Sequence, residues 1–212
     1  MVSDQTLAEF SAELTSKAPT PGGGGASSVC GALAASLGAM VGNLTLGKKK
    51  YAEVEPRVKE IIPQLEALRD RLLELSDADA AAFEPLSRAY GLPKATPEEQ
   101  TLKAEVMEAA LRTACEPPFQ IMETTCQVVD LLAELAQIGT RIAISDVGVG
   151  AAFASAALKG ASLNVFINAK SMGDREYADD LVARTQALLD DGCKKADATY
   201  LAVERGIRWP KR

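Results

Sequence analysis

The chain has 212 residues, of which 47% are hydrophobic, and a formal net charge of −6 at pH 7. This length suffices for one domain with a sizeable core, and the acidic balance argues against a general nucleic-acid binder, which would be basic. The chain contains no histidine, which excludes histidine-dependent catalytic triads and histidine metal sites. Any acid–base chemistry must therefore use Asp, Glu, Lys, Tyr, Cys or bound water.

Helical periodicity dominates the chain, and no alternating segment of useful length predicts a strand. Residues 3–17 predict a short amphipathic helix with Leu7, Phe10 and Leu14 on one face, and the prolines that follow break it. Residues 27–46 predict a helix rich in Ala, Gly and Ser. Its small side chains at 31, 35, 38 and 42 form a smooth face that admits another backbone, within the bundle or across a dimer.

The stretch from Ala26 to Leu46 is uncharged and long enough to span a bilayer. Alanine, glycine and serine partition weakly into lipid, and Asn43 lies inside the stretch. We therefore expect a buried helix of a soluble protein and no membrane partner. The four cysteines, Cys30, Cys115, Cys126 and Cys193, form no CxxC pair and follow no signal peptide, so we expect reduced, mostly buried thiols in a cytoplasmic protein.

Proline, glycine and capping signals divide the rest of the chain. Thr96-Pro97-Glu98-Glu99 predicts a helix start, and Asp174 predicts the N-cap of the last helix. Pro117-Pro118 predicts a break. The expected helices span residues 54–89, 96–113, 119–137, 142–158, 160–172 and 174–205. Together these signals predict a single all-α domain over residues 1–212, a bundle of long and short helices.

The most informative segment opens with Gly22 to Gly25 and closes with Lys48, Lys49, Lys50 and Tyr51. No Lys-Ser/Thr pair follows the glycines and no strand precedes them, which excludes a phosphate-binding P-loop. The glycines form either a tight turn into the helix or a loop that lets backbone N–H groups approach a ligand. The lysines form either a solvated helix end, suited to the helix dipole, or an anion contact with one lysine turned inward.

Other polar residues stand out against apolar surroundings. Asp146 lies in ISDVGVGAA and is either a structural N-cap or an acid/base with a perturbed pKa. Asp79 lies on the long helix, either on a solvated face or reaching a pocket. Asn164 and Asn168 are one helical turn apart, and their amides suit either the bracketing of a heterocycle or helix termination.

A family resemblance joins these segments. PTPGGGGAS…GALAASLGAMVGNLTLGKKKY resembles the cyclodeaminase/cyclohydrolase domain of the formiminotransferase-cyclodeaminase family, as do DADAAAF, YGLPKATPEE, AISDVGVGAA and ALKGASLNVFINAKSMGD. The matches span nearly the whole chain in the family's order and look most similar to its short, stand-alone bacterial cyclohydrolases. The chain departs from the family at Gly139-Thr140-Arg141, where members commonly carry a Gly-Asn pair.

The resemblance implies an all-helical homodimer with folate sites near the subunit interface. It implies hydrolysis of 5,10-methenyltetrahydrofolate to 10-formyltetrahydrofolate, with no metal and no cofactor. On residue chemistry, Asp146 and Lys48 are the expected catalytic groups. The remaining expected substrate contacts are Gly22, Gly23, Gly24, Gly25, Asn43, Lys49, Lys50, Tyr51, Asp79, Asn164 and Asn168. The alternatives are formiminotetrahydrofolate cyclodeaminase, which releases ammonia, and a non-catalytic folate-binding helical module.

Overall fold

The computed structural model describes residues 1 and 4–208, and these residues contain helices and no strand. The helices are α1 (Leu7–Leu14), α2 (Gly23–Thr45), η2 (Lys49–Tyr51), α3 (Glu55–Tyr90), α4 (Pro97–Ile138), η3 (Arg141–Ala143), α5 (Ile144–Lys170) and α6 (Arg175–Arg208). The prediction of an all-α bundle is confirmed.

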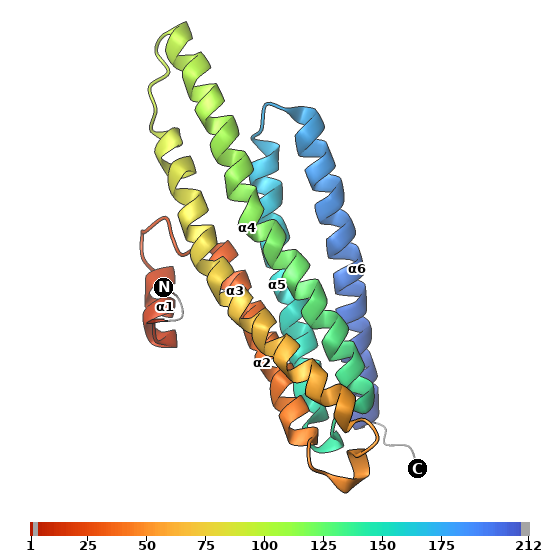
Figure 1. The fold of residues 1–212 in the computed structure, drawn as a ribbon. Coiled ribbons are helices and arrows are strands. Elements are labelled where there is room, and N and C mark those ends of the chain that lie inside the picture. The colour runs from red at the N-terminus through yellow and green to blue at the C-terminus, as the bar shows by residue number, and fades with distance from the viewer. Residues whose placement is uncertain (2–3, 209–212) are drawn as a thin grey trace.

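The bundle has two layers (Figure 1). Helices α3, α4 and α6 form the layer nearer the viewer, and α2 and α5 pack behind it. Helix α2 packs mainly on α3 and α5, and α5 on α2, α4 and α6. Helix α1 lies apart beside α3 and is shorter than predicted; of its expected apolar face only Phe10 is buried, whereas Leu7 is 73% exposed. Residue 3 of that prediction lies outside the described residues.

The predicted helix start at Thr96 is confirmed. The Thr96 Oγ1 accepts a hydrogen bond from the Glu99 backbone N–H at 3.2 Å, and the Glu99 carboxylate accepts one from the Thr96 N–H at 3.2 Å. Asp174 likewise accepts from the Tyr177 N–H at 3.1 Å, at the start of α6. Gly139 ends α4, as expected.

The predicted break at Pro117-Pro118 is wrong, because α4 runs unbroken through both prolines. Each proline lacks an N–H and so removes one backbone hydrogen bond. Both rings are nevertheless buried, next to the buried Cys115 and Phe119. Packing of the flanking turns therefore keeps the segment helical against its local preference.

The predicted division of α5 near Gly160 is also wrong, since α5 is one helix from Ile144 to Lys170. A Cβ added at Gly160 would overlap the Ser27 Oγ of α2. This glycine thus allows two helices to approach closely and does not mark a helix end.

Helix α2 begins at Gly23, four residues before its predicted start. Its small face is buried within the bundle and meets large side chains rather than another backbone. A Cβ at Gly38 would lie 2.9 Å from Leu65 Cδ1, and one at Gly42 would lie 2.7 Å from Ile62 Cγ1. The glycines therefore accommodate the aliphatic ridge of α3.

Two segments, Gly23–Thr45 and Arg141–Lys170, are long and apolar enough to cross a membrane by length and composition, each with a mean hydropathy of 1.4. In this fold 61% and 56% of their most apolar windows are buried. Core helices of soluble proteins have the same character, so this finding is weak evidence for a membrane span.

Candidate functional site

The candidate residues fall into two groups at opposite ends of α2. Gly22–Gly25, Asp79 and Asn164 form the glycine-end group. Lys48, Tyr51 and Thr140 meet at the other end and, with the nearby first turn of α5, form the lysine-end group. Helix α2 has 23 residues, so at 1.5 Å per residue the groups are roughly 33 Å apart. They are too far apart to act on one carbon atom within a single chain.

At the glycine end, Asp79 of α3 faces the first turn of α2. The α2 N-cap is Gly22, which has no side chain to cap the helix, and the Asp79 carboxylate accepts a hydrogen bond from the Gly25 N–H instead. A Cβ at Gly24 would overlap the carboxylate oxygens. Glycine at this position therefore lets the carboxylate reach the helix N-terminus, where the macrodipole stabilises negative charge.

The Asp79 carboxyl has a perturbed pKa. Burial raises its pKa from the ordinary 3.8 to about 6, and the hydrogen bond from Gly25 opposes part of that rise. Asp79 is half-buried, so the carboxylate is largely ionised at neutral pH and still a better proton acceptor than an exposed aspartate. Of the two alternatives left open by the sequence, the solvated face is excluded.

The two asparagines of α5 point to different neighbours. The Asn164 side chain lies 3.6 Å from where a Cβ of Gly23 would be, and its Nδ2 donates to the Gly160 carbonyl at 2.9 Å. Asn168 is buried, and its Nδ2 donates to the Ala114 carbonyl of α4 at 3.2 Å. Only Asn164 therefore lies at the glycine end, beside Gly23 at the start of α2.

At the lysine end, three elements converge through hydrogen bonds. The Lys48 Nζ donates to Thr140 Oγ1 at 3.0 Å, and the Thr140 N–H donates to Thr45 Oγ1 at 2.9 Å. The Arg141 N–H donates to the Tyr51 hydroxyl at 3.0 Å. This last bond is the main reason why the pKa of the Tyr51 phenol is lowered from its ordinary value. Lys48 is thus the lysine that turns inward.

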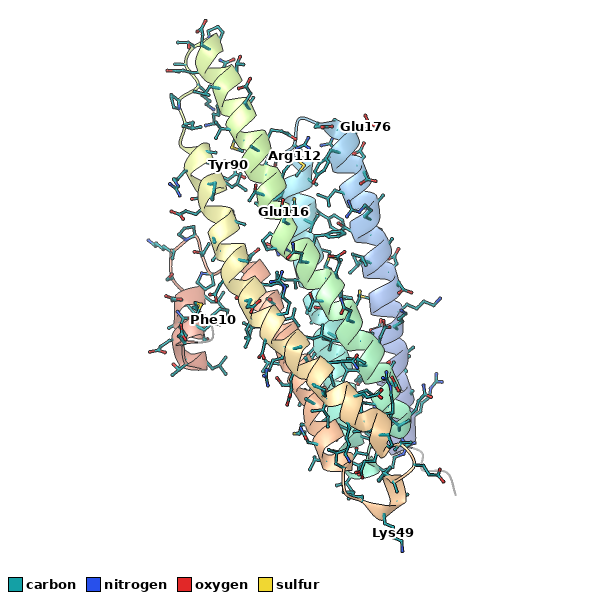
Figure 2. All side chains as sticks on the ribbon, in the orientation of Figure 1. Phe10, Lys49, Tyr90, Arg112, Glu116 and Glu176 are labelled. Carbon is teal, nitrogen blue, oxygen red and sulfur yellow. The ribbon has the colours of Figure 1, made fainter. Side chains whose placement is uncertain are left out.

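The other residues expected at this end are more exposed. Lys49 and Lys50 are exposed on η2, and Lys49 projects away from the bundle at its tip (Figure 2). Asn43 is exposed near the end of α2. Asp146 is half-buried in the first turn of α5, whose N-cap is Ala143. Asp146 is therefore not the N-cap, although it lies in the first turn of the helix.

Within residues 1 and 4–208, no group of three or more His, Cys, Asp or Glu side chains is arranged to hold a metal ion. The four cysteines are free. Burial raises the pKa of the Cys115 and Cys126 thiols to about 12 and about 11, so neither is a thiolate nucleophile at neutral pH.

Comparison with known proteins gives a family. The family model described as formiminotransferase-cyclodeaminase matches residues 6–187. The chain belongs to this family. Both groups of candidate residues lie within the matched region.

Three proteins illustrate what this chain is similar to. A methenyltetrahydrofolate cyclohydrolase from Methylorubrum extorquens is 40% identical over 98% of this chain and 100% of its own length. A formimidoyltransferase-cyclodeaminase from Rattus norvegicus is 34% identical over 95% of this chain, which spans only 37% of that protein. The crystal structure of formiminotetrahydrofolate cyclodeaminase from Thermotoga maritima superposes with a TM-score of 0.82 at 30% identity, covering 99% of this chain and all of that one.

Some contacts in this family member had no signal in the sequence. Thr140 was identified as a departure from the family's Gly-Asn pair, but its bonds to Lys48 and to Thr45 come from segments far apart in the chain. The position of Asp79 against Gly24 and Gly25 is equally non-local. Residue spacing within one helix carries no information about such contacts.

Proposed function

We propose that this protein hydrolyses 5,10-methenyltetrahydrofolate to 10-formyltetrahydrofolate. The observation that carries the proposal is the 40% identity, from end to end, to a stand-alone methenyltetrahydrofolate cyclohydrolase. The chain matches that relative over its whole length, whereas it spans about a third of the bifunctional relatives.

The reaction suits the groups available. The bridging carbon of the substrate is part of an amidinium-like cation and is already electrophilic. A water oxygen bonds to this carbon and loses a proton to a base. The bond from the carbon to N5 then breaks, N5 gains a proton, and the hydroxyl of the adduct loses its proton as the formyl C=O forms. One water is consumed and one proton is released overall.

We assign roles by charge and pKa. Asp79 accepts the proton of the attacking water, because its raised pKa makes it a stronger base than an exposed carboxylate. Asp146 stabilises the cation through its negative charge. Lys48, positioned by Thr140, supplies the proton to N5. The glycine entrance and Asn164 contact the pterin.

None of these steps requires a metal or a redox cofactor, so we expect hydrolysis to persist after treatment with EDTA. The free cysteines support a cytoplasmic enzyme.

The homodimer is part of this proposal, and the back face of the bundle supports it. The outward stripe of α5 carries Val149, Ala152, Ala156, Leu163 and Ile167, all exposed, with Leu163 66% and Ile167 61% accessible. The outward stripe of α2 adds Leu33, Met40 and Leu44. Monomeric proteins rarely leave so large an apolar face uncovered.

The size of this face fits a second copy of the chain. Two neighbouring helices about 33 Å long cover roughly 650 Å², close to the ~800 Å² per partner of a stable interface. The exposed Lys159 near the middle of the α5 stripe disfavours burial in lipid, while Ala152 and Ala156 allow close helix contact.

A two-fold axis that crosses the helices at right angles would complete the site. Such an axis lays α2 antiparallel against its counterpart, so that the lysine end of one protomer faces the glycine end of its partner. Lys48 and Asp146 of one protomer then meet Asp79 of the other. This arrangement brings the lysine-end group of one protomer and the glycine-end group of the other into one pocket. A single chain cannot do so, because its own two groups lie at opposite ends of α2.

The first test follows the near-ultraviolet absorbance of 5,10-methenyltetrahydrofolate with EDTA-treated protein, at a pH where spontaneous hydrolysis is slow. We expect enzyme-dependent loss of the band. We expect Asp146→Asn and Asp79→Asn to lower kcat by about 100-fold or more, as for loss of an acid–base group. A normal far-ultraviolet circular dichroism spectrum shows that the variants fold. Saturable binding without turnover would leave only a folate-binding module.

The second test mixes two inactive variants, Asp79→Asn and Lys48→Met, and lets subunits exchange. Random pairing gives half heterodimers, each with one intact shared site, and so about a quarter of wild-type activity. The control mixes Asp146→Asn with Lys48→Met, both at the lysine end, which leaves no heterodimer site intact. Equal inactivity of both mixtures would rule out the shared site.

A second candidate is formiminotetrahydrofolate cyclodeaminase, favoured by the TM-score of 0.82 to the Thermotoga maritima enzyme over its whole length. In that reaction N10 attacks the formimino carbon and ammonia leaves. Ammonia release and a rising methenyl band from formiminotetrahydrofolate, with no hydrolysis of the methenyl compound, would move the assignment to this activity.

A further inference from the structure

The Tyr51 hydroxyl lies within the lysine-end group, and none of the catalytic roles assigned above uses it. Tyr51 is the last residue of η2 and is half-buried. Its oxygen accepts a hydrogen bond from the Arg141 backbone N–H at 3.0 Å. The phenol oxygen is therefore held beside η3, an element that follows it by 90 residues in the chain.

The surroundings of this oxygen favour a negative charge on it. The hydrogen bond from the Arg141 N–H is the largest cause of the lowered Tyr51 pKa, and a hydrogen bond from the Thr140 side chain lowers that pKa further, while burial opposes both. The Lys50 ammonium lies 5.7 Å from the centre of the Tyr51 ring, and its charge also lowers the pKa of the phenol. Such a phenol releases its proton more readily than a free tyrosine, which suits a general acid.

Thr140 connects Tyr51 to Lys48. Its side-chain oxygen, in a residue that is only 1% exposed, accepts a hydrogen bond from the Lys48 Nζ at 3.0 Å. The Thr140 backbone N–H donates to Thr45 Oγ1 at 2.9 Å, and that hydroxyl donates to the Val41 carbonyl at 2.7 Å. Thr140 is thus fixed against the end of α2, with the hydrogen of its own hydroxyl left to donate.

These hydrogen bonds all run in one direction. The Lys48 ammonium can only donate, so Thr140 accepts from it. A hydroxyl that lowers the pKa of a phenol donates to the phenol oxygen, so Thr140 donates to Tyr51. The Tyr51 oxygen then receives hydrogens from both Thr140 and Arg141. Its own hydrogen remains to be donated to a third group, and a substrate atom at the lysine end can be that group.

We infer that Tyr51 is the catalytic acid that protonates N5, and that Lys48 resupplies its proton through Thr140. The inference rests on the proposed function. As the bond from the bridging carbon to N5 breaks, its electron pair forms a bond to the Tyr51 hydrogen. The Tyr51 oxygen takes the Thr140 hydrogen, and Thr140 takes one from Lys48. The neutral Lys48 amine then takes a proton from water, which restores the starting state.

The first test removes the phenol hydroxyl. Tyr51→Phe keeps the ring and should lower kcat by about 100-fold or more, as for loss of a general acid, with KM changed by no more than about twofold. Tyr90→Phe is the matched control, since Tyr90 is 55% exposed at the end of α3, and it should keep the wild-type kcat. Circular dichroism shows that both variants fold. If Lys48 protonated N5 directly, Tyr51→Phe would keep most of its rate.

The second test examines the connection through Thr140. Thr140→Val keeps the branched shape and the backbone N–H but lacks the hydroxyl, and it should lower kcat by about tenfold or more. Thr140→Ser restores a hydroxyl and should recover most of the rate. In the Tyr51→Phe background Thr140→Val should cause no further loss, because residues of one relay are not additive. Additive losses would show that the two side chains act separately and would overturn the relay.

The third test needs no substrate. The near-ultraviolet absorbance of tyrosinate is titrated in the wild type and in Tyr51→Phe, and the difference gives the pKa of Tyr51. We expect this pKa to lie below the ordinary 10 and to be higher in Thr140→Val, since no hydroxyl then stabilises the phenolate. A Tyr51 pKa that Thr140→Val leaves unchanged would remove the link and overturn the relay.

The outcomes separate this inference from the proposed function. If the wild type hydrolyses the methenyl compound and Tyr51→Phe keeps its kcat, the inference is wrong and the proposed function stands. If the wild type does not hydrolyse it, the proposed function is wrong. The relay is then measured on ammonia release from formiminotetrahydrofolate, where the leaving nitrogen also needs a proton, and an unchanged kcat of Tyr51→Phe overturns it. Inactivity in both assays overturns both.

Discussion

Asp79 experiences two opposing influences on one carboxylate. Burial between α3 and α2 favours the neutral acid, while the Gly25 N–H and the α2 macrodipole favour the anion. The pKa of about 6 is the net result, and it places the carboxylate where modest changes in pH alter its charge. Both the activity and the stability of the protein should therefore change as the Asp79 carboxyl gains or loses its proton.

The first prediction concerns activity. If ionised Asp79 accepts the proton of water, kcat/KM should fall about tenfold per pH unit below pH 6, following its pKa of about 6. Asp79→Asn should remove this acid limb along with most of the rate. Measurement requires kcat/KM between pH 5 and 8, corrected for non-enzymatic hydrolysis. An unchanged acid limb in the residual activity of Asp79→Asn would assign the titration to another group.

The second prediction concerns stability and has the opposite sign. The folded pKa of about 6 lies above the ordinary 3.8, so the native state binds more protons than the unfolded state between these values. Stability contributed by the protonated form is therefore lost as pH rises from about 4 to 6. Asp79→Asn should raise the free energy of unfolding by about 1–3 kcal/mol at pH 8 and by little at pH 4. Urea unfolding at both pH values measures the difference.

At the residue scale, the sequence predicted the identity of the candidate site residues better than it predicted their contacts. Lys48, Asp79 and Asn164 do lie at the two ends of α2, but the identity of the inward lysine depends on Thr140, 92 residues away. Burial raises the pKa of Asp79, and that burial depends on the close approach of another helix at Gly24. Neighbours in sequence do not reveal such burial.

Elements were predictable where the signal is local. The Thr96–Glu99 capping box uses four consecutive residues and was predicted correctly. The predicted breaks at Pro117-Pro118 and Gly160 are wrong, because packing between helices overrides the local preference at both sites. Local propensity is weak compared with the burial of a long apolar face.

The third prediction tests close packing between α2 and α3. Gly38→Ala would place a Cβ 2.9 Å from Leu65 and 3.0 Å from Leu132, both fully buried, and overpacking of this kind costs about 1–3 kcal/mol. The matched control is Gly206→Ala near the end of α6, where an added Cβ meets nothing within 4 Å. That variant should gain up to about 1 kcal/mol from helix propensity. Chemical denaturation of both variants and the wild type measures these changes in the free energy of unfolding.

At the scale of the whole molecule, the main feature is the exposed apolar face formed by α2 and α5. Composition predicted that residues 27–46 form a small-residue helix, but not that the outward stripes of α2 and α5 would share one face of the bundle. That shared face depends on α2 and α5 lying side by side behind the other layer. The homodimer that we propose thus rests on a property of the assembled bundle and not of any one segment.

The fourth prediction tests the dimer directly. Leu163→Lys with Ile167→Lys places two charges on the exposed face of α5 and should convert a dimer of about twice 22.3 kDa into a monomer. Activity should fall with it if the site is shared. Leu102→Lys is the control, because Leu102 is 58% exposed on the far part of α4. Light scattering after size exclusion gives the mass; a monomeric wild type would exclude the interface.

The α3–α4 hairpin extends past the turn that joins α5 to α6 (Figure 1). The Gly173 N–H donates to the Glu108 carboxylate and Arg112 pairs with Asp174, which ties α4 to that turn. The residues of α4 before Glu108 include no buried side chain. Few buried contacts support this tip, which should open on its own while the bundle stays folded. Its amide hydrogens should exchange with deuterium through local opening, at rates insensitive to substitutions such as Gly38→Ala that lower global stability.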